Sequence, residues 1–327
     1  MNYKRQGGLH EKKRHLLVLL VLAVSLAFTG ALSAADNYPA KAVVLVYHSQ
    51  AGSGGDIFLR NMGKAIEKQI GKPIIVENRT GGGGSNAWMY SKNAKPDGYT
   101  LLGISSSIIA GPLQTKMAVS YADFKPVAQV FFDPTVIFVP AKSPFKTFDD
   151  VIKDAKANPG KQNWGAGNPG SAETMCIEKV AQLADMQITV VPFEGGADVM
   201  VEIIAGRIDA AIGEYAEIAS QVEAGNIRII ACLNSERMEE APDVPTLKES
   251  GVDFVFEKIR GIVAPKDVPD SVVKVWTDAL AKIFDDPEFK TYYKENMLVP
   301  RFLPAEKMQK VMDDQHAFFK EMSKGLY

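Results

Sequence analysis

Eight residues with the chemistry of an anion-binding turn stand near the start of the chain, reading Ser49, Gln50, Ala51, Gly52, Ser53, Gly54, Gly55 and Asp56. An apolar run (42–47) precedes them and a helical pattern (57–66) follows. A strand that passes through glycines into a helix leaves unpaired N–H groups at the helix N-terminus, where the dipole adds about half a positive charge. Such a place suits a carboxylate or a phosphate. An ordinary tight turn also needs glycine, so both interpretations stay open.

Other polar residues are candidates for the same site, each with a structural alternative. Asp56 either caps the helix or accepts a hydrogen bond from a ligand. Arg260 either pairs with a ligand carboxylate or bridges two lobes through an acid. Ser105, Ser106 and Ser107 either donate hydroxyls to a ligand or only turn the chain.

The aromatic, histidine and cysteine side chains also allow two interpretations each. Phe193 and Trp164 either stack on a ligand or belong to the core. His48 either binds an anion or is a structural histidine. Export from the cytoplasm permits a disulfide between Cys176 and Cys232, but their apolar surroundings favour two buried thiols.

The chain shows no catalytic motif. Gly81–Gly84 are not followed by the Lys-Ser/Thr of a phosphate-binding loop, and we expect them to pack a helix start. No serine lies in Gly-x-Ser-x-Gly, and no His/Cys/Asp group has metal-ligand spacing. We therefore predict a protein that is not an enzyme and holds neither cofactor nor metal.

Charge is distributed unevenly along the 327 residues. Residues 1–35 hold five of the 37 basic side chains and one of the 39 acidic ones, so the remainder carries 32 basic and 38 acidic groups and a formal charge of −6. A mildly acidic body argues against nucleic acid as a partner. An anionic ligand must therefore be held by local donors.

The N-terminus has the layout of a secretory signal. Basic residues precede an apolar segment (16–28), and small residues follow at 30–35. The apolar segment is short for a membrane span, which needs about 20 residues, although an uncleaved anchor is the alternative. We predict cleavage after Ala34 or Ala35 and a periplasmic mature protein.

From Tyr38 onward, strand and helix patterns alternate as in parallel βαβ units. We expect strands at 42–47, 74–77, 99–104, 161–165, 188–192, 208–212 and 227–231, and helices at 56–70, 85–94, 148–158, 172–184, 197–205, 215–224, 271–283 and 305–322. A further short helix is expected within 242–251. Two extended segments, near 135–139 and 254–262, would connect two α/β lobes, with lobe 1 at 36–137 plus 259–327 and lobe 2 at 138–258. Glycine-bearing turns at the strand ends place a ligand crevice between the lobes.

Short motifs along this framework resemble the periplasmic solute-binding proteins of tripartite tricarboxylate transporters, also called Bug receptors. They are Tyr38-Pro39, Gly52–Asp56, Glu77–Gly84, Pro96–Leu101, Asn168–Ser171, Pro192–Gly196, Gly206–Asp209, Glu223–Gly225, Asp243–Thr246 and Gly261–Pro265. The resemblance covers about 38–300 in the expected order. Each motif is short, but together they are specific.

The resemblance implies a two-lobed, venus-flytrap receptor with the fold of type II periplasmic binding proteins. Such a receptor captures a small organic carboxylate and delivers it to a membrane permease of the tripartite tricarboxylate type; we expect a monomer. One ligand carboxylate would be held by backbone donors and ordered waters from the loops Ser49–Asp56 and Ser105–Ser107. The other end of the ligand would meet helix-end donors around Gly170, Ser171, Gly195 and Gly196. An exported sensor that signals to a membrane kinase is the alternative, followed by a secreted hydrolase.

The chain departs from the family pattern at positions expected to contact the variable end of the ligand. His48 and Ser49 stand where many members have an aromatic and a small apolar residue. Arg260 replaces an aromatic, and Gly213-Glu214-Tyr215 replaces a common Asp-Asn. The sequence therefore leaves the ligand unidentified.

Overall fold

A computed structural model describes residues 38–239, 241–324 and 326, and residues 41–327 form one compact unit. The predicted signal peptide lies outside the described residues. None of the helices within the described ranges combines the length and apolarity needed to span a bilayer.

Eleven strands are present among the described residues: β1 (Val43–Tyr47), β2 (Ile74–Asn78), β3 (Thr100–Ser105), β4 (Phe124–Asp133), β5 (Thr135–Pro140), β6 (Asn163–Ala166), β7 (Thr189–Pro192), β8 (Ala210–Glu214), β9 (Ile227–Cys232), β10 (Lys258–Pro265) and β11 (Val299–Pro304). The helices are α2 (Gly54–Ile70), α3 (Ser85–Lys92), α4 (Ser107–Gln114), α5 (Phe148–Ala157), α6 (Ala172–Leu183), α7 (Gly196–Ile204), α8 (Tyr215–Glu223), α9 (Asp270–Lys282), α10 (Pro287–Glu295) and α11 (Ala305–Ser323). Short 3₁₀ turns lie at Gly82–Gly84, Tyr121–Asp123 and Ile283–Asp285.

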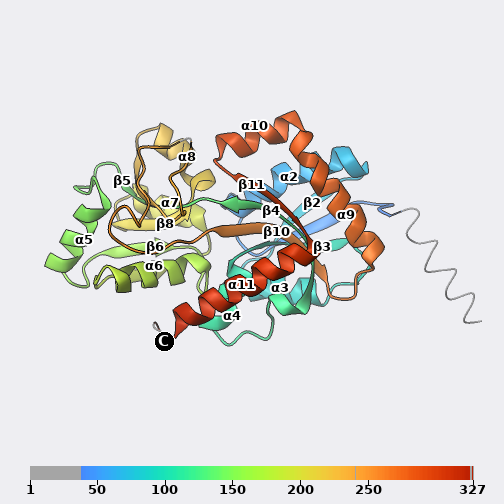
Figure 1. Cartoon of the computed structure of the whole chain (residues 1–327), viewed down its shortest axis with the longest axis horizontal. Helices are drawn as coiled ribbons and strands as arrows, with labels where there is room; N and C mark the ends of the chain where they lie inside the picture. The colour runs from blue at the N-terminus through green and yellow to red at the C-terminus, as the bar shows by residue number, and fades with distance from the viewer. Residues whose placement is uncertain (1–37, 240, 325, 327) are drawn as a thin grey trace, which may run out of the picture. The chain divides into compact units, whose positions relative to one another are not determined.

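The strands form two sheets, which confirms the two-lobed α/β fold (Figure 1). The first has the order β11-β4-β10-β3-β1-β2 and the second β7-β6-β8-β5-β9. Pairs β1–β2, β1–β3, β6–β7 and β6–β8 are parallel, as the alternating pattern predicts. Strands β4, β5, β10 and β11 pair antiparallel with their neighbours, so the expectation of parallel units holds for only part of each sheet.

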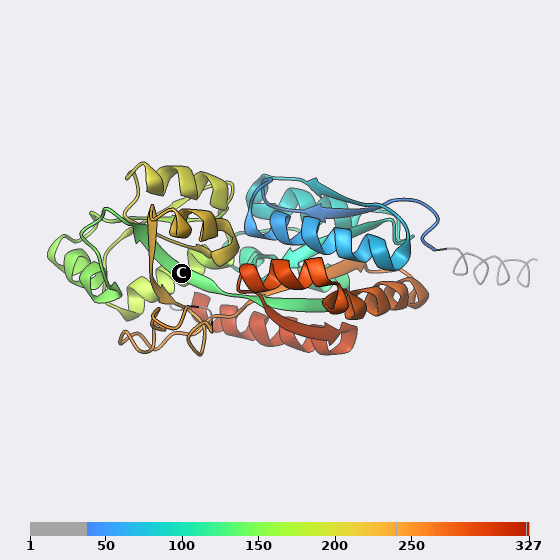
Figure 2. The same cartoon turned by 90° about the horizontal axis from the view of Figure 1, so that it is seen from above.

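The chain passes from the first sheet to the second at Pro134, between β4 and β5, and returns to the first in β10. In Figure 2 the β4–β5 segment, drawn in green, runs through both groups of elements. These two passages bring the start of β10 close to the ends of β4 and β8. The lobe boundaries expected from the sequence remain a prediction.

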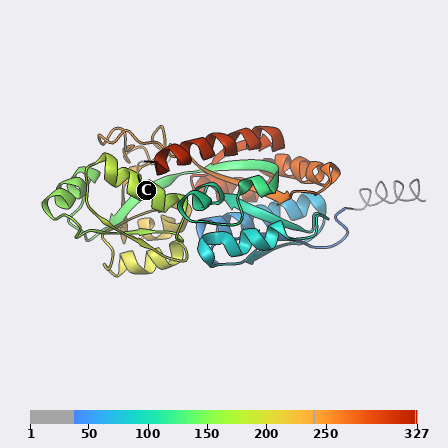
Figure 3. The ribbon, with the colours of Figure 1, turned by 90° about the horizontal axis from the view of Figure 1, so that it is seen from below.

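Apolar packing continues across both sheets. The buried side chains of Trp88 in α3 and Trp164 in β6 belong to one hydrophobic cluster with Met308, Met312 and Phe319 of α11. Helix α11 lies along β4 and contacts α4 and α6 (Figure 3). Its buried residues recur on one helical face, so this amphipathic helix joins the two sheets through a shared core.

Three local expectations need correction. Residues 242–251 form turns rather than a short helix: the Thr246 hydroxyl and the Glu249 carboxylate accept from each other's backbone N–H groups as at a helix start, but the chain turns only once before Gly251, whose φ of 87° is left-handed. Helices α4 and α10 were not expected. Strand β11 was not expected either, because its two prolines are tolerated only at a sheet edge, where it lies.

Both cysteines are buried and free, as the apolar surroundings favoured.

Gly261 in β10 permits the close approach of β4 beside the site. A Cβ there would lie 2.7 Å from the Ala128 carbonyl oxygen and 3.2 Å from the Gln129 Cα. We expect Gly261→Ala to lower the free energy of unfolding by about 1–3 kcal/mol in urea denaturation, because backbone must move. Gly167→Ala is the matched control, since its added methyl meets no atom closer than 3.7 Å. Equal stability of the two variants would contradict this account of β10.

Candidate functional site

The predicted anion-binding turn forms the N-terminus of α2. Ser53 is the N-cap residue, and its side chain makes no capping hydrogen bond. The Asp56 carboxylate instead accepts a hydrogen bond from the Gly52 N–H at 2.9 Å and forms an ion pair with Arg60. Asp56 therefore bonds the turn before the helix rather than the first helical N–H groups, and both of its expected roles, helix cap and ligand acceptor, stay predictions. Gly55 has no room for a side chain, since a Cβ would lie 1.9 Å from the Tyr47 hydroxyl.

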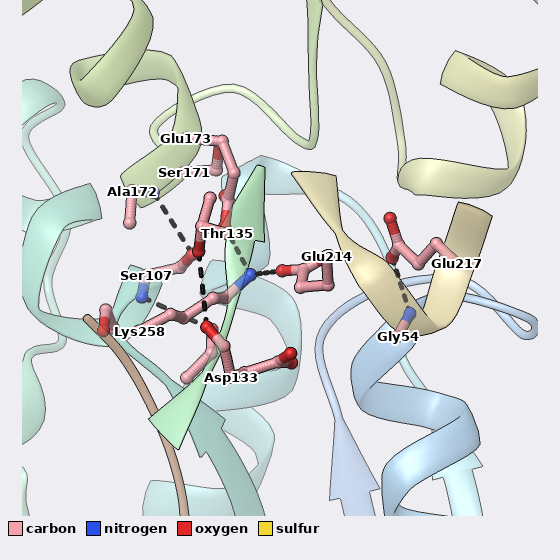
Figure 4. Close-up of polar contacts among 12 residues, drawn as sticks. Gly54, Ser107, Asp133, Thr135, Ser171, Ala172, Glu173, Glu214, Glu217 and Lys258 are labelled. Atoms are coloured by element: carbon pink, nitrogen blue, oxygen red, sulfur yellow. Dashed lines mark hydrogen bonds and ion pairs between the residues drawn. The ribbon is translucent and has the colours of Figure 1, made fainter. Parts of the chain in front are cut away.

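A carboxylate of the protein itself lies at this helix N-terminus. The Gly54 N–H donates to Glu217 Oε1 at 2.5 Å, and Glu217 comes from the first turn of α8, 163 positions further along the chain (Figure 4). Gly196 lies against the same carboxylate, because a Cβ there would be 1.9 Å from Glu217 Oε2. In Figure 2 the N-terminal end of α2, in blue, points toward the elements of the second sheet. The arrangement shows that the turn can hold a carboxylate.

Burial raises the pKa of Glu217 to about 7, although the Gly54 N–H and the Arg260 guanidinium oppose the rise. Glu217 forms no ion pair with any of the described residues. It is therefore a partly buried carboxyl group whose pKa lies near neutral pH.

Two buried cations organise the other acids of the site. The Lys258 ammonium, at the start of β10, contacts the carboxylates of Glu173 in α6 and Glu214 in β8. The Arg260 guanidinium donates to Asp133 Oδ2 at 2.7 Å and lies 3.3 Å from Glu214 Oε1. These groups are at most 6% exposed at the side chain, so β4, β8, β10 and α6 meet in one buried ionic cluster. Figure 4 shows its contacts around Lys258.

The cluster also sets the charge of neighbouring groups. Burial raises the pKa of Glu173, but the Lys258 ammonium outweighs it and lowers the pKa to about 2. Burial, together with Lys258 and Arg260, lowers the pKa of His48 to about 3. His48 is therefore neutral at physiological pH and adds no positive charge.

A cavity of about 30 Å³ lies between these elements, enough for about one or two water molecules. Among the predicted site residues, it is lined by Ser49, Ser53, Gly55, Ser107, Gly195, Gly196 and Glu214. The lining also includes Tyr47, His48, Phe138, Gly167, Asn168, Glu173, Val199, Ile212, Gly213, Glu217 and Lys258. Three buried polar atoms of this lining, His48 Nδ1, Ser53 Oγ and Asn168 Nδ2, have no hydrogen-bond partner in the part of the chain described.

The other predicted residues lie outside the lining: Gln50, Gly52, Gly54, Asp56, Ser105, Ser106, Gly170, Ser171, Phe193 and Arg260. Several have structural partners. The Ser106 hydroxyl accepts from the Ile259 N–H, and the Ser171 hydroxyl caps α6 by accepting from the Thr174 N–H. Arg260 contacts the acids Asp133 of β4 and Glu214 of β8, which is the structural alternative that the sequence offered for it. A ligand role for these residues stays a prediction.

Hydrogen bonds between elements of the two sheets surround the cavity. The Ser107 hydroxyl accepts from the Ala172 N–H at 3.3 Å, and the Ser49 hydroxyl donates to the Glu194 carbonyl at 3.3 Å. With the Gly54–Glu217 contact, these bonds join the helix starts of one lobe to those of the other.

Sequence reasoning missed the three charged residues that dominate the site, Glu173, Glu217 and Lys258. Two weak signals were available. Glu173 and Glu217 each lie in the first turn of a helix that follows a strand end, and Lys258 precedes Arg260 by two, which puts both on one face of a strand.

This fold is that of two-lobed α/β binding proteins, and the candidate site lies at helix N-termini of both lobes. The family described as "Tripartite tricarboxylate transporter family receptor" matches residues 58–326. A protein of Cupriavidus necator, "UPF0065 protein in gbd 5'region", is 30% identical over 308 residues, which cover 90% of this chain and 92% of the relative. The chain therefore belongs to the tripartite tricarboxylate transporter receptor family.

Two solved structures share the fold. A Rhodopseudomonas palustris protein solved with adipate has a TM-score of 0.84 at 24% identity, covering 88% of this chain and 97% of that chain. MatC from Rhodopseudomonas palustris, solved with bound malate, has a TM-score of 0.82 at 22% identity, covering 88% and 100%. At these identities the likeness shows the fold alone, which is the two-lobed α/β fold described above.

Glu217 gives the ligand-free protein a defined pH dependence. Because its pKa in the folded state lies above the ordinary 4.5, the folded protein binds this proton more tightly than the unfolded chain. The stability contributed by the protonated form is therefore lost as the pH rises from about 4.5 to about 7. We expect Glu217→Gln to gain about 1–3 kcal/mol of unfolding free energy over wild type between pH 5 and pH 8.

Urea denaturation at pH 5, 6, 7 and 8 measures this difference, in which the titrations of other groups largely cancel. The control is Glu223→Gln, which changes an exposed carboxylate at the end of the same helix. A stability difference between Glu217→Gln and wild type that is constant across this range would rule out the raised pKa.

Proposed function

We propose that this protein is a periplasmic receptor that captures a small organic carboxylate and delivers it to a tripartite tricarboxylate-type membrane permease. The observation that carries the proposal is the Gly54 N–H bonded to the Glu217 carboxylate. A main-chain donor at a helix N-terminus that holds one carboxylate can hold another of the same geometry. The ligand's acid group would take the place of Glu217.

Entry of a ligand requires the two lobes to separate. A cavity of about 30 Å³ holds one or two waters, and even a four-carbon acid has several times as many atoms. Separation would break the contacts of Gly54 with Glu217, Ser49 with Glu194 and Ser107 with Ala172. The freed Gly54 N–H and the Ser53 and Ser107 hydroxyls would then bind the ligand, and closure would bring the second lobe onto it.

The relatives support this proposal in two ways. The family consists of transporter receptors, and two proteins with the same fold were solved with adipate and with malate.

The basic and apolar N-terminal segment supports export by a cleavable signal. We further propose that the protein is a monomer that binds its ligand without chemical change.

Calorimetric titration of the mature protein with organic acids tests the receptor function directly. The panel should include C4 to C6 dicarboxylates, tricarboxylates, aromatic acids and amino acids, with product analysis after incubation. The proposal predicts saturable binding of at least one acid without turnover. Binding of none, or conversion of the bound acid, would contradict it.

The main-chain donor itself can be removed by Gly54→Pro. Proline is favoured at the first helical position, and Ser53, with φ −69° and ψ 155°, has the extended conformation that precedes proline. A hydrogen bond to a charged group contributes about 1.5–3 kcal/mol, so we expect Gly54→Pro to weaken carboxylate binding about tenfold or more relative to Gly54→Ala.

Gly54→Ala is the matched control because it keeps the N–H and adds a Cβ in the same place, 3.2 Å from Glu217 Cγ and 3.3 Å from an Arg260 nitrogen. Far-ultraviolet circular dichroism and thermal unfolding check that both variants fold. If the two variants bind the acid equally well, the Gly54 N–H does not hold the ligand.

A further inference from the structure

The charges around the cavity do not balance. Three buried carboxyl groups, those of Asp133, Glu173 and Glu214, and the partly buried carboxyl group of Glu217 face two buried cations, Lys258 and Arg260. Three of the acids contact a cation, and Glu217 forms no ion pair within the described ranges. The four acids outnumber the two cations, and because charges in protein interiors are normally paired, Glu217 is the acid left without a cationic partner.

A plain dicarboxylate would make this imbalance worse. Its first acid group would displace Glu217 from the Gly54 N–H and leave that carboxyl inside the closed site. Its second acid group would meet a region lined by Glu173, Glu214 and Glu217. In a poorly solvated cavity, repulsion between such like charges is much stronger than in water.

The polar groups left over at the cavity also indicate a ligand. His48 Nδ1, Ser53 Oγ and Asn168 Nδ2 are unpartnered among the described residues, and their side chains line the cavity at 3–6% exposure. Unsatisfied buried polar atoms are rare, and these three surround the same space from both lobes. They provide neutral donors and acceptors, whereas the acids provide the charge.

We propose that the ligand is a zwitterion, an organic acid that also carries a cationic nitrogen such as an ammonium group. Its carboxylate would lie at the N-terminus of α2, and its cationic nitrogen would lie among Glu173, Glu214 and Glu217. The first half of this assignment rests on the proposed receptor function. The second half rests on the acids of the second lobe; Figure 4 shows Glu173 and Glu214 beside Lys258, and Glu217 at Gly54.

Lys258 does not already serve as the missing cation. Its ammonium contacts Glu173 and Glu214, and the Arg260 guanidinium is bonded to Asp133 and to the Tyr47 hydroxyl at 2.7 Å. Both cations therefore have acceptors of their own. A ligand nitrogen near Glu217 would complete the pairing without displacing either of them.

The test is calorimetric titration of the mature protein with pairs of acids that differ by one amino group. Suitable pairs are L-glutamate with glutarate, L-aspartate with succinate, and 6-aminohexanoate with hexanoate. We expect the amino-bearing member of at least one pair to bind at least tenfold more tightly. Tighter or equal binding of every plain acid would overturn the zwitterion assignment and leave the receptor function standing. Binding of neither member of any pair, nor of any other acid, would overturn both.

Glu217→Gln tests the contact with the cationic nitrogen of the ligand separately from the contact with its carboxylate. The amide oxygen still accepts from the Gly54 N–H, but the negative charge is gone. We expect affinity for the amino-bearing acid to fall about tenfold and affinity for the plain acid to rise, so that the preference narrows or reverses. Glu223→Gln, at the exposed end of α8, should leave the preference as in wild type. An unchanged preference in Glu217→Gln would contradict the role given to Glu217.

Discussion

The site depends on one hydrogen bond between main chain and side chain, from the Gly54 N–H to the Glu217 carboxylate. The donor belongs to a helix start in the first lobe and the acceptor to a helix start in the second. Because a helix N-terminus favours negative charge, this contact closes the cavity with a group that resembles the expected ligand. The Glu217 carboxylate and the acid group of a ligand would therefore compete for the Gly54 N–H.

The buried ionic cluster is better explained by binding than by stability. Removing charges from water costs several kcal/mol for each ion, and well-packed apolar residues often replace buried ion pairs without loss. Lys258 and Arg260 nevertheless join acids from both sheets, and the partly buried Glu217 has no cation among the described residues. A protein selected for stability alone has little reason to keep such a group. A receptor that recognises a charged ligand would have a reason to keep it.

The sequence predicted the local parts of this arrangement and missed those that depend on tertiary contacts. The turn at Ser49–Asp56 and most strands and helices follow from glycines and apolar periods that are short in range, and the structure confirms these parts, although it adds α4, α10 and β11 and has no helix within 242–251. Gly54 and Glu217 are 163 positions apart, and no local pattern indicates that they meet. Arg260 was expected to pair with either a ligand or an acid, and only the fold brings Asp133 to it. Strand β11 escaped prediction because its prolines are compatible only with the edge position that the sheet gives it.

The most direct test of this account is a crystal structure of the mature protein with its bound acid. The account predicts a ligand carboxylate oxygen within hydrogen-bonding distance of the Gly54 nitrogen, with the Glu217 carboxylate displaced from it. A structure in which Glu217 still accepts from the Gly54 N–H while the ligand lies elsewhere would contradict the account.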